Sequence, residues 1–451
     1  MRDVLTQLYG AAVGGAATGP VTARAVDSLA VSRDRRVWVL AFGKAAHAMT
    51  AAAVTSLQRS LHQIVGGLIV APDESPSPYG TIAIACGDHP VPGPRSFAAA
   101  QRLGELAARM KSGDVALALV SGGASSLIAA PLRGMTESDL TSLYELLLAS
   151  GLDISAMNTV RKRFSRWGGG RLSLAIAPAG THCLAVSDVI GDDLSTIGSG
   201  PCVPDPTTAD DVIDILEDAK LLSRLTKPFR TYLADVSRGA EPETPKRGHP
   251  AFAHGSARVI ADNRGALEAA ADRARALGAA AVYVVDAPLT GEAVRRGEDI
   301  ARWLLELRAK GSTSETGTRR FAIWGGETTV TLHQPSDSSN RHPTPAPPPP
   351  GGRCQELALA AARVLDEAGE RAAGISLLAA GTDGRDGPTD AAGAMVDAGT
   401  WGLIHAAGAD PTQALARHDS YAALDRAGAL FKPGPTGTNV MDIVIGIVDS
   451  L

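Results

Sequence analysis

The stretch ISLLAAGTDGRDGPTD, residues 375–390, joins a mostly apolar run to a segment with three glycines and three aspartates. The run 375–380 is typical of a buried strand, and open α/β sheets bind ligands at the carboxyl ends of their strands. A turn rich in carboxylates and bare backbone N–H groups at that place suits a substrate that carries phosphate and a metal ion. An ordinary surface turn has the same composition, so the interpretation depends on the rest of the chain.

Apolar strand-like runs alternate with helical patterns along the first half of the chain. Strands are expected at 37–41, 66–71, 82–86, 115–120 and 182–186, and helices at 44–57, 96–110, 210–219 and 221–233, with another helix opening near Ser125. This alternation predicts a largely parallel sheet with helices on both faces. The polar segment 237–250, rich in proline and glycine, is typical of a domain linker.

A second alternation follows this linker. Strands are expected at 257–261, 281–285, 320–324, 328–333, 375–380 and 442–448, and helices at 264–277, 291–309 and 355–368. We therefore predict an α/β protein with two α/β domains, residues 1–240 and 241–451, both with largely parallel sheets. The proline-rich segment 334–352 cannot build a packed core and is expected to be a mobile loop, with docking of a partner as the alternative.

Composition excludes several classes of protein. The chain has 43 Lys and Arg residues against 48 Asp and Glu residues, a formal net charge of −5, so bulk charge recruits neither nucleic acid nor anionic membrane. Its four cysteines lie far apart without a CxxC pair, which indicates neither a zinc site nor a disulfide framework. No run reaches the roughly 18 to 20 apolar residues that span a bilayer, and the N-terminus resembles an amphipathic helix. We expect a cytoplasmic monomer or homodimer whose partners are small molecules.

Two glycine-containing segments follow predicted strands and indicate anion binding. The loop Ser121-Gly122-Gly123-Ala124-Ser125-Ser126 lets backbone N–H groups close around a phosphate or carboxylate, with hydroxyls beside it. It is neither a Walker A loop nor a GxGxxG fingerprint, and an N-capped turn is the alternative. Lys44, in FGKAA, is expected in the first turn of a helix, where a cation is unfavourable unless an anion joins it.

Charged side chains recur at other strand ends. Asp188, Asp192 and Asp193 follow the strand 182–186 and could hold Mg²⁺ or a substrate hydroxyl. Glu327 follows a Gly-Gly pair, and Arg353 follows another and could clamp a transferring phosphoryl group. The basic run Arg161-Lys162-Arg163, before Gly168-Gly169-Gly170, fits a solvated helix face, an anion site or a hinge.

Together these segments resemble the class II glycerate kinases, the glycerate 2-kinase family with a MOFRL domain that is often labelled hydroxypyruvate reductase. The resemblance covers nearly the whole chain. It rests on FGKAA at 42, GDHPVPGPRS at 87, LVSGGASSLIAAP at 119, MNTVRKRFSRWGGGRL at 157, SDVIGDDLSTIGSGPCVPDPTT at 187, GGETTVTL at 325, GGRCQELALAAA at 351 and GTDGRDGPTDAAGAMVD at 381.

The resemblance implies an active site in a cleft between two α/β domains and the conversion of D-glycerate and ATP to 2-phosphoglycerate and ADP with a divalent cation. It implies that Lys44 lies near the transferred phosphate and that Arg353 faces it, both as catalytic residues. The expected substrate or nucleotide contacts are Ser121, Gly122, Gly123, Ala124, Ser125, Ser126, Asp188, Glu327, Asp383 and Asp386. The expected metal ligands are Asp188 and Asp192.

The chain departs from the family pattern at two positions. Cys354 and Met441 stand where the family usually has asparagine, so polar contacts there are missing and substrate choice could differ. A kinase of a related sugar acid and a non-catalytic sugar-acid binding protein therefore stay open. An NAD(P)H-dependent hydroxypyruvate reductase is a further alternative, although no strand is followed by GxGxxG with an acidic residue about 20 positions later.

Overall fold

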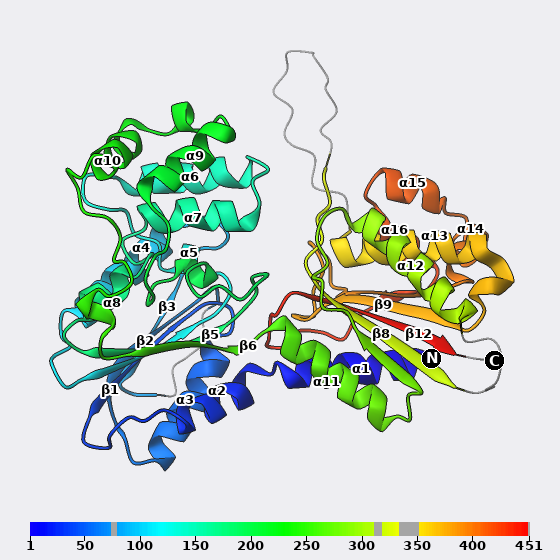
Figure 1. Cartoon of the computed structure of the whole chain (residues 1–451), viewed down its shortest axis with the longest axis horizontal. Helices are drawn as coiled ribbons and strands as arrows, with labels where there is room; N and C mark the ends of the chain where they lie inside the picture. The colour runs from blue at the N-terminus through cyan, green and yellow to red at the C-terminus, as the bar shows by residue number, and fades with distance from the viewer. Residues whose placement is uncertain (74–78, 311–317, 333–350, 450–451) are drawn as a thin grey trace. The chain divides into compact units, whose positions relative to one another are not determined.

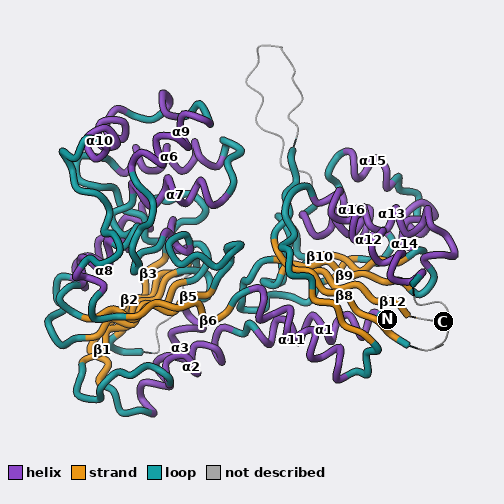
Figure 2. The backbone as a smooth tube through the Cα atoms, viewed as in Figure 1, coloured by secondary structure: helices purple, strands orange, loops and turns teal. Residues whose placement is uncertain are grey.

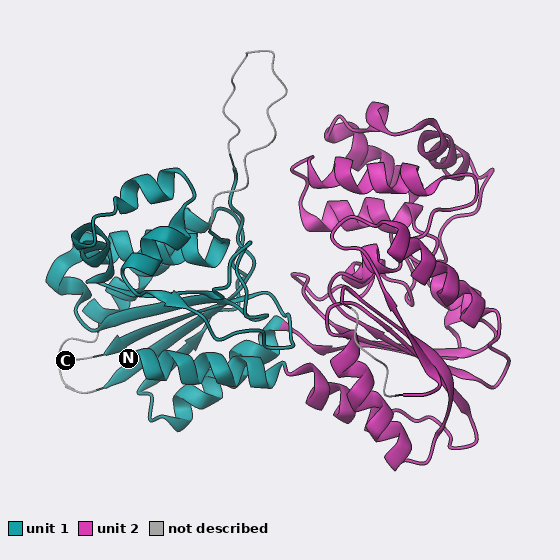
Figure 3. Cartoon of the chain, turned by 180° about the vertical axis from the view of Figure 1, so that it is seen from behind, with its two compact units in different colours: residues 1–16, 263–451 teal, residues 17–262 magenta. Residues whose placement is uncertain are grey.

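The computed structural model describes residues 1–73, 79–310, 318–332 and 351–449. The chain forms two compact units (Figure 3), Ala17–Asp262 and a unit that combines Met1–Ala16 with Asn263–Leu451. This division differs from the expected boundary at 240. The strand β6 (Ser256–Ala261) pairs with the sheet of the first unit, while α1 (Arg2–Gly15) packs on α11 (Asn263–Ala276) of the other.

The Ala17–Asp262 unit contains a sheet whose strand pairs are all parallel, as expected. Its strand order is β3-β2-β1-β4-β5-β6. Besides β6, the strands are β1 (Arg36–Phe42), β2 (Gln63–Ala71), β3 (Ile82–Cys86), β4 (Val115–Val120) and β5 (Gly180–Val186). The order reverses direction between β1 and β4, and the register pairs Phe42 with Val120, so these two strands end side by side. Such a switch point is where open α/β sheets bind ligands.

Helices cover both faces of this sheet (Figure 1), with α2 (Thr18–Asp27) and α3 (Ala46–Arg59) on one side. The other side carries α4 (Pro94–Ala107), α5 (Ala124–Leu127) and α8 (Arg171–Ile176). A further helical layer has its own apolar core and consists of α6 (Glu137–Leu148), α7 (Ile154–Phe164), α9 (Ala209–Asp218) and α10 (Lys227–Ser237). The helix expected at 221–233 begins later, because Pro228 takes a first-turn position in α10.

The second unit also has a six-stranded sheet between helical layers (Figure 2), which confirms the α/β class. Its order is β11-β10-β9-β12-β8-β7; β12 runs antiparallel to both β8 and β9, β10 runs antiparallel to both β9 and β11, and β7 pairs with β8 in parallel. The expected parallel pairing therefore holds in the first sheet, whereas the described strands of this sheet are mainly antiparallel. The strands are β7 (Ala281–Val284), β8 (Arg319–Gly326), β9 (Ile375–Gly381), β10 (Gly393–Asp397), β11 (Leu430–Phe431) and β12 (Asp442–Asp449). Asp442 therefore opens its strand between Gly326 and Gly381.

The helices α1 and α11 lie on one face of this second sheet, and α12 (Ala293–Ala309) and α13 (Arg353–Ala368) on the other. The remaining helices are α14 (Thr400–Ala406), α15 (Pro411–Ala416) and α16 (Ser420–Arg426). The strand expected at 328–333 is reduced to one isolated bridge, Thr329 with Glu292, and His333 lies outside the described residues. The proline-rich segment also lies outside them, except for Gly351 and Gly352. No helix of the described residues is long and apolar enough to cross a bilayer.

Candidate functional site

The loops that follow β1 and β4 are hydrogen-bonded to each other at the switch point. The Lys44 backbone N–H donates to Gly122 O at 2.9 Å, and the Ser121 N–H donates to Phe42 O at 2.9 Å. Gly43 has φ +119°, and a Cβ on it would lie 2.2 Å from Ser121 Oγ. The close approach of the two loops therefore requires glycine at position 43.

The hydroxyls of the Ser121–Ser126 loop hold the loop together. Ser121 Oγ accepts from the Ala45 N–H at 3.1 Å and donates to Phe42 O. Ser126 Oγ donates to Gly123 O, and Ser125 Oγ pairs with Ser199 Oγ at 2.7 Å. Ser121 and Ser126 therefore donate their hydroxyl protons within the protein, whereas either hydroxyl can be the donor in the Ser125–Ser199 pair. The helix expected there is a single turn, α5, so the loop offers backbone N–H groups rather than a long helix end.

Gly123 lies close to side chains from two other loops, His89 and Lys44. It has φ +87°, and a Cβ on it would lie 3.0 Å from His89 Cδ2 and 3.8 Å from Lys44 Cγ. Lys44 itself precedes α3, which begins at Ala46, and its side chain is exposed. Three loops that follow β1, β3 and β4 thus bring Lys44, His89 and Gly123 together.

His89 is a neutral imidazole at this place. Its side chain is exposed, but neighbouring protein atoms partly desolvate the ring. This desolvation, together with the cations Lys44 and Arg161, lowers the pKa of His89 to about 4. A neutral imidazole can accept or donate a hydrogen bond at neutral pH.

Asp188, which follows β5, carries a carboxylate that faces the charge of Lys44. Burial raises the pKa of Asp188, and Lys44 opposes that rise. Besides a hydrogen bond from its own backbone N–H, Asp188 makes no contacting ion pair or side-chain hydrogen bond within the described ranges. An unpaired, partly buried carboxylate is suited to a cation that arrives with a substrate.

The other aspartates of this loop behave differently from each other. Asp192 has φ +54° and a buried Oδ1 atom that lacks a hydrogen-bond partner among the described residues. Burial raises the pKa of its carboxyl group. Asp193 instead caps the following turn, accepting from the Ser195 N–H at 2.9 Å and from the Thr196 hydroxyl at 2.9 Å. The Asp192 carboxyl, which also interacts with the Ser187 hydroxyl, therefore keeps one buried oxygen without a partner among the described residues, whereas both oxygens of Asp193 accept hydrogen bonds.

The basic run Arg161-Lys162-Arg163 is not a solvated face. The three side chains are 7%, 1% and 0% exposed, at the end of α7. Lys162 forms an ion pair with Asp205 at 2.8 Å, and Arg163 forms one with Glu243 at 2.5 Å. The expectation of a solvated face was wrong because Asp205 and Glu243, distant in sequence, pair with two of the cations.

Arg353, the second expected catalytic cation, begins α13 in the other unit. Its Nε and Nη2 atoms donate to the two oxygens of Asp442 at 2.6 and 3.0 Å, and Nη1 lies 2.5 Å from Glu327 Oε1. Burial alone would lower the pKa of Arg353, but Asp442 and then Glu327 raise it. The guanidinium is therefore permanently charged and held by two carboxylates in a fixed orientation.

The aspartates of the opening motif also lie near the start of α13. Asp386 accepts from the Cys354 N–H at 3.2 Å and the Gln355 N–H at 2.8 Å, so it caps the helix. Its burial and the nearby Asp442 raise the pKa of Asp386 to about 7. Asp383 uses one oxygen to accept from the Arg385 N–H at 2.9 Å. Of the two, only Asp383 has an oxygen that these contacts leave available.

The two departures from the family pattern are both buried. Burial and the carboxylates Asp442 and Asp386 raise the pKa of the Cys354 thiol, which therefore stays protonated. Met441 is 5% exposed and has φ +67°, a conformation that asparagine adopts more readily than methionine. Its carbonyl accepts from the Thr382 N–H and hydroxyl. Among the described residues, no group of three or more His, Cys, Asp or Glu side chains is arranged to hold a metal ion.

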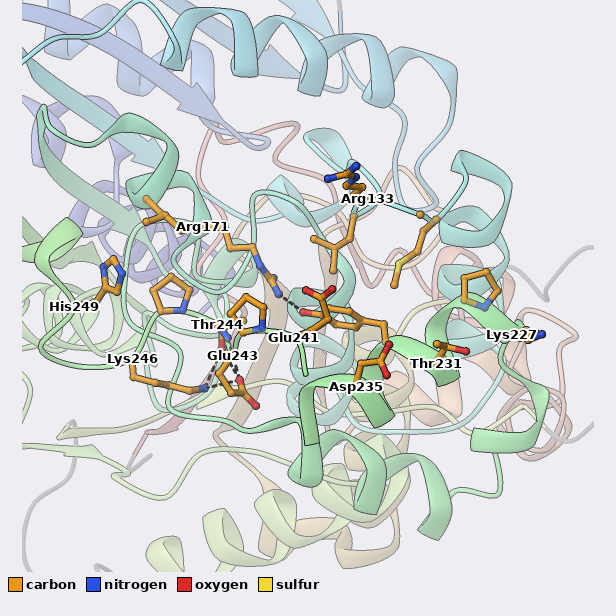
Figure 4. A pocket seen from close by; sticks show the side chains of 18 of the residues that line it. Arg133, Arg171, Lys227, Thr231, Asp235, Glu241, Glu243, Thr244, Lys246 and His249 are labelled. Carbon is orange, nitrogen blue, oxygen red and sulfur yellow. Dashed lines mark hydrogen bonds and ion pairs between the residues drawn. The ribbon is translucent and has the colours of Figure 1, made fainter. Parts of the chain in front are cut away.

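A large cavity of about 1020 Å³ lies elsewhere in the Ala17–Asp262 unit (Figure 4), and none of the expected site residues lines it. Some of its charged side chains, those of Arg171, Glu243 and Lys246 among them, already have protein partners. Arg171 donates to Tyr232 Oη at 2.9 Å and to Lys162 O at 3.0 Å, and Lys246 lies 3.1 Å from Glu243. We therefore place the candidate site at the strand ends and not in this cavity.

Three residues near these groups received no role from the sequence. His89 lies in the quoted segment GDHPVPGPRS directly after a strand, which was the available signal. Asp442 was visible as the single acid that opens an apolar strand. Tyr9, whose hydroxyl donates to Gly381 O at 2.8 Å, had no signal, because its helix is far from that strand in sequence.

Comparison with known proteins identifies the family. Residues 4–234 match a domain of unknown function, DUF4147, and residues 320–442 match the MOFRL family. The D-glycerate 2-kinase of Thermotoga maritima is 36% identical over 92% of this chain and 91% of its own length. A putative hydroxypyruvate reductase of Agrobacterium vitis is 38% identical over 98% of this chain and 93% of its own.

The fold agrees with these sequence matches. A crystal structure of glycerate kinase from Thermotoga maritima superposes with a TM-score of 0.81 at 33% identity, covering 99% of both chains. The expected resemblance is thus confirmed over the whole length. The chain belongs to the MOFRL-containing glycerate 2-kinase family.

Proposed function

We propose that this chain transfers the γ-phosphoryl group of ATP to the 2-hydroxyl of D-glycerate, giving 2-phosphoglycerate and ADP. The observation that carries the proposal is the position of Lys44. It is an exposed cation at a topological switch point, it lies over the glycine loop, and it has no contacting carboxylate in the described part of the chain. The names of the relatives in Thermotoga maritima and Pyrococcus horikoshii support the same reaction.

Phosphoryl transfer needs little covalent help from the protein, so positioned charge is the main requirement. Lys44 is proposed to stabilise negative charge on the transferring group, and the backbone N–H groups of Gly122 and Gly123 to bind phosphate oxygens. Arg353 is the proposed second cation, and Asp442 and Glu327 hold its guanidinium in one orientation. Asp383 is proposed to contact a substrate hydroxyl, and Asp386 to position α13 behind Arg353.

The residues present fit a divalent cation that accompanies ATP. Mg²⁺ keeps several waters and usually binds one or two carboxylates together with substrate phosphates. Asp188 has an unpaired carboxylate, and Asp192 has a buried oxygen without a partner in the described residues. Asp188 would hold the cation, with Asp192 as the second carboxylate, and the cation would neutralise charge on the phosphates.

A ³¹P NMR experiment on the purified protein with ATP, MgCl₂ and D-glycerate tests the proposal. A growing 2-phosphoglycerate resonance with equal ADP formation is expected. A 3-phosphoglycerate product would contradict the proposed acceptor atom, and unchanged ATP would contradict the proposed substrate. Absorbance at 340 nm with hydroxypyruvate and NADH or NADPH tests the reductase named for the Agrobacterium relative, and no enzyme-dependent loss is expected.

A further inference from the structure

Three consecutive cations at the end of α7 are all removed from solvent. Arg161, Lys162 and Arg163 are 7%, 1% and 0% exposed. Burying a charge costs several kcal/mol unless a partner of opposite charge compensates it. Each of the three therefore needs a partner.

Two of the three cations have carboxylate partners within their own unit. Lys162 Nζ lies 2.8 Å from Asp205 Oδ1. Arg163 Nη1 lies 2.5 Å from Glu243 Oε2, and its Nη2 donates to Thr207 O at 2.8 Å. These two cations therefore have a counter-charge within the fold, although Arg163 Nε lacks a hydrogen-bond partner among the described residues.

Arg161 has no carboxylate partner in the described residues. Its Nη1 makes one long hydrogen bond, 3.4 Å, to Asn158 Oδ1. Its Nε and Nη2 atoms are buried and lack any hydrogen-bond partner within the described ranges. The guanidinium lies 4.7 Å from the centre of the Tyr144 ring, and the Tyr144 hydroxyl donates to Ser125 O at 3.0 Å. The Tyr144 ring thus contacts one face of the Arg161 guanidinium, and Asn158 accepts from its Nη1. The edge formed by Nε and Nη2 has no partner among the described residues.

The edge without a partner is the one that this protein uses elsewhere for carboxylates. Arg36 donates through Nε and Nη2 to the two oxygens of Asp114 at 2.8 and 2.7 Å. Arg353 donates through the same two atoms to Asp442. A planar fork of two parallel N–H groups matches a carboxylate. The missing partner of Arg161 therefore has the geometry of a carboxylate.

Arg161 lies beside the candidate site rather than in a separate part of the unit. Arg161 lies close enough to His89 for its charge to lower the pKa of that imidazole, as the charge of Lys44 does. His89 and Lys44 both lie over Gly123. Two cations therefore lie near the His89 imidazole. Lys44 adjoins the glycine loop, and Arg161 has two buried N–H donors without a partner in the described residues.

We propose that Arg161 binds the carboxylate of the acceptor acid through its Nε–H and Nη2–H groups and so selects 2-hydroxy acids over neutral polyols. The inference rests on the proposed function, since it names the residue that recognises the acceptor. A nucleotide phosphate is the competing ligand. We favour the carboxylate because one buried fork supplies the two donors that a carboxylate needs, whereas the exposed Lys44 and the adjoining loop N–H groups suit a phosphate.

The test compares Arg161→Gln with wild type, using D-glycerate and its uncharged amide as acceptors. Wild type is expected to prefer the acid by about 10³-fold in kcat/KM, and Arg161→Gln to lose most of that preference. The KM for D-glycerate is expected to rise by about 100-fold, while the KM for ATP stays unchanged. Arg161→Lys should restore part of the preference, because it keeps the charge without the fork.

Arg166→Gln is the matched control, since this exposed arginine on the same segment stacks on Trp167 at 4.7 Å. It should keep the wild-type preference. An Arg161→Met variant should be at least as thermally stable as wild type in the absence of substrate, because a buried charge without a partner is removed. A large drop in Tm would assign Arg161 a structural role and overturn the inference.

The outcomes separate this inference from the proposed function. If wild type phosphorylates D-glycerate and Arg161→Gln keeps its preference for the acid, the inference fails and the function stands. A rise in the KM for ATP alone would assign Arg161 to the nucleotide and also overturn it. If wild type does not phosphorylate D-glycerate, calorimetric titration measures whether D-glycerate binds. Binding by wild type but not by Arg161→Gln would still support a carboxylate site at Arg161.

Discussion

Lys162 Nζ lies 2.8 Å from Asp205 Oδ1, and neither side chain is more than 1% exposed. Asp205 also accepts from the Thr207 N–H and hydroxyl and from the Thr244 hydroxyl. Burial alone would raise the pKa of Asp205, but Lys162 and these hydrogen bonds lower it to about 2. Lys162 directly follows Arg161 in α7. The ion pair with Asp205 therefore fixes the end of α7 and, with it, the position of Arg161.

Asp205→Asn is expected to lower the free energy of unfolding by about 3–5 kcal/mol, because it leaves Lys162 buried without a counter-charge. Asp27→Asn, at the exposed pair with Arg59, is the matched control and should cost less than about 1 kcal/mol. Urea denaturation measures both. Equal losses in the two variants would contradict the structural role of the Asp205 pair.

The lowered pKa of Asp205 predicts that the free energy of unfolding depends on pH. Its folded pKa of about 2 lies below its ordinary value of 3.8, so the unfolded chain takes up the proton first as the pH falls. The stabilisation is present above pH 4 and is lost between about pH 4 and pH 2. The stability difference between wild type and Asp205→Asn should therefore shrink over that range. A constant difference from pH 5 to pH 2.5 would contradict it.

Lys44→Met is expected to lower kcat by about 10² or more with saturating substrates, because the charge that stabilises the transferring group is lost. Its Tm should stay within about one degree of wild type, since Lys44 is exposed and has no contacting carboxylate in the described residues. Lys111→Met is the control, because this exposed lysine precedes β4 at the opposite end of the strand. Full activity of Lys44→Met would remove Lys44 from the mechanism.

Gly123→Ala tests the close approach of His89 and Lys44 to the glycine loop. The substitution places a Cβ 3.0 Å from His89 Cδ2 at a φ of +87°, so it strains the backbone and displaces the imidazole. Gly151→Ala is the control, because its φ is +75° and no atom lies within 4 Å of the added Cβ. Both variants should lose about 1–2 kcal/mol of stability, but only Gly123→Ala should lose activity at least tenfold, as steady-state kinetics would show. Equal kinetics would contradict the placement of the site.

Arg353→Lys keeps a positive charge but loses the two-donor edge that holds Asp442. Arg36→Lys breaks the same kind of pair with Asp114 at a strand start remote from the strand ends. Both changes should lower stability by a similar amount, about 1–3 kcal/mol. Only Arg353→Lys is expected to lower kcat, by at least tenfold. Parallel measurement of Tm and kcat distinguishes a catalytic arginine from one that only supports the fold.

Lys220→Gly is expected to raise stability by about 1 kcal/mol. Lys220 follows the end of α9 with φ +56°, and the bonds Lys220 N–H to Glu217 O and Leu221 N–H to Leu216 O form a Schellman motif. Glycine adopts this left-handed conformation without the cost that a Cβ brings. Lys220→Ala keeps the Cβ and should leave the unfolding midpoint near that of wild type. A midpoint that does not rise for glycine would contradict the strain.

Sequence patterns predicted the elements that carry most of the site. The apolar runs ending at Phe42, Val120 and Val186 are strands, and the charged or glycine-rich residues after them lie at one edge of a parallel sheet. The second sheet was less predictable, because β10 and β11 are short and their pairing depends on contacts between distant segments. The capping role of Asp386 was also hidden, since it joins the motif at 381–390 to the start of α13.

By itself, the sequence determined the α/β class, the family and the placement of Lys44, Asp188 and Arg353 beside strand ends or helix starts, because these depend on periodicity and on residues adjacent in the chain. Tertiary structure decided which buried cation receives a carboxylate. Asp205 and Glu243 pair with Lys162 and Arg163, and Arg161 between Tyr144 and Asn158 receives none in the described residues. The three cations are neighbours in a run of similar composition, and only the folded packing around each side chain distinguishes them.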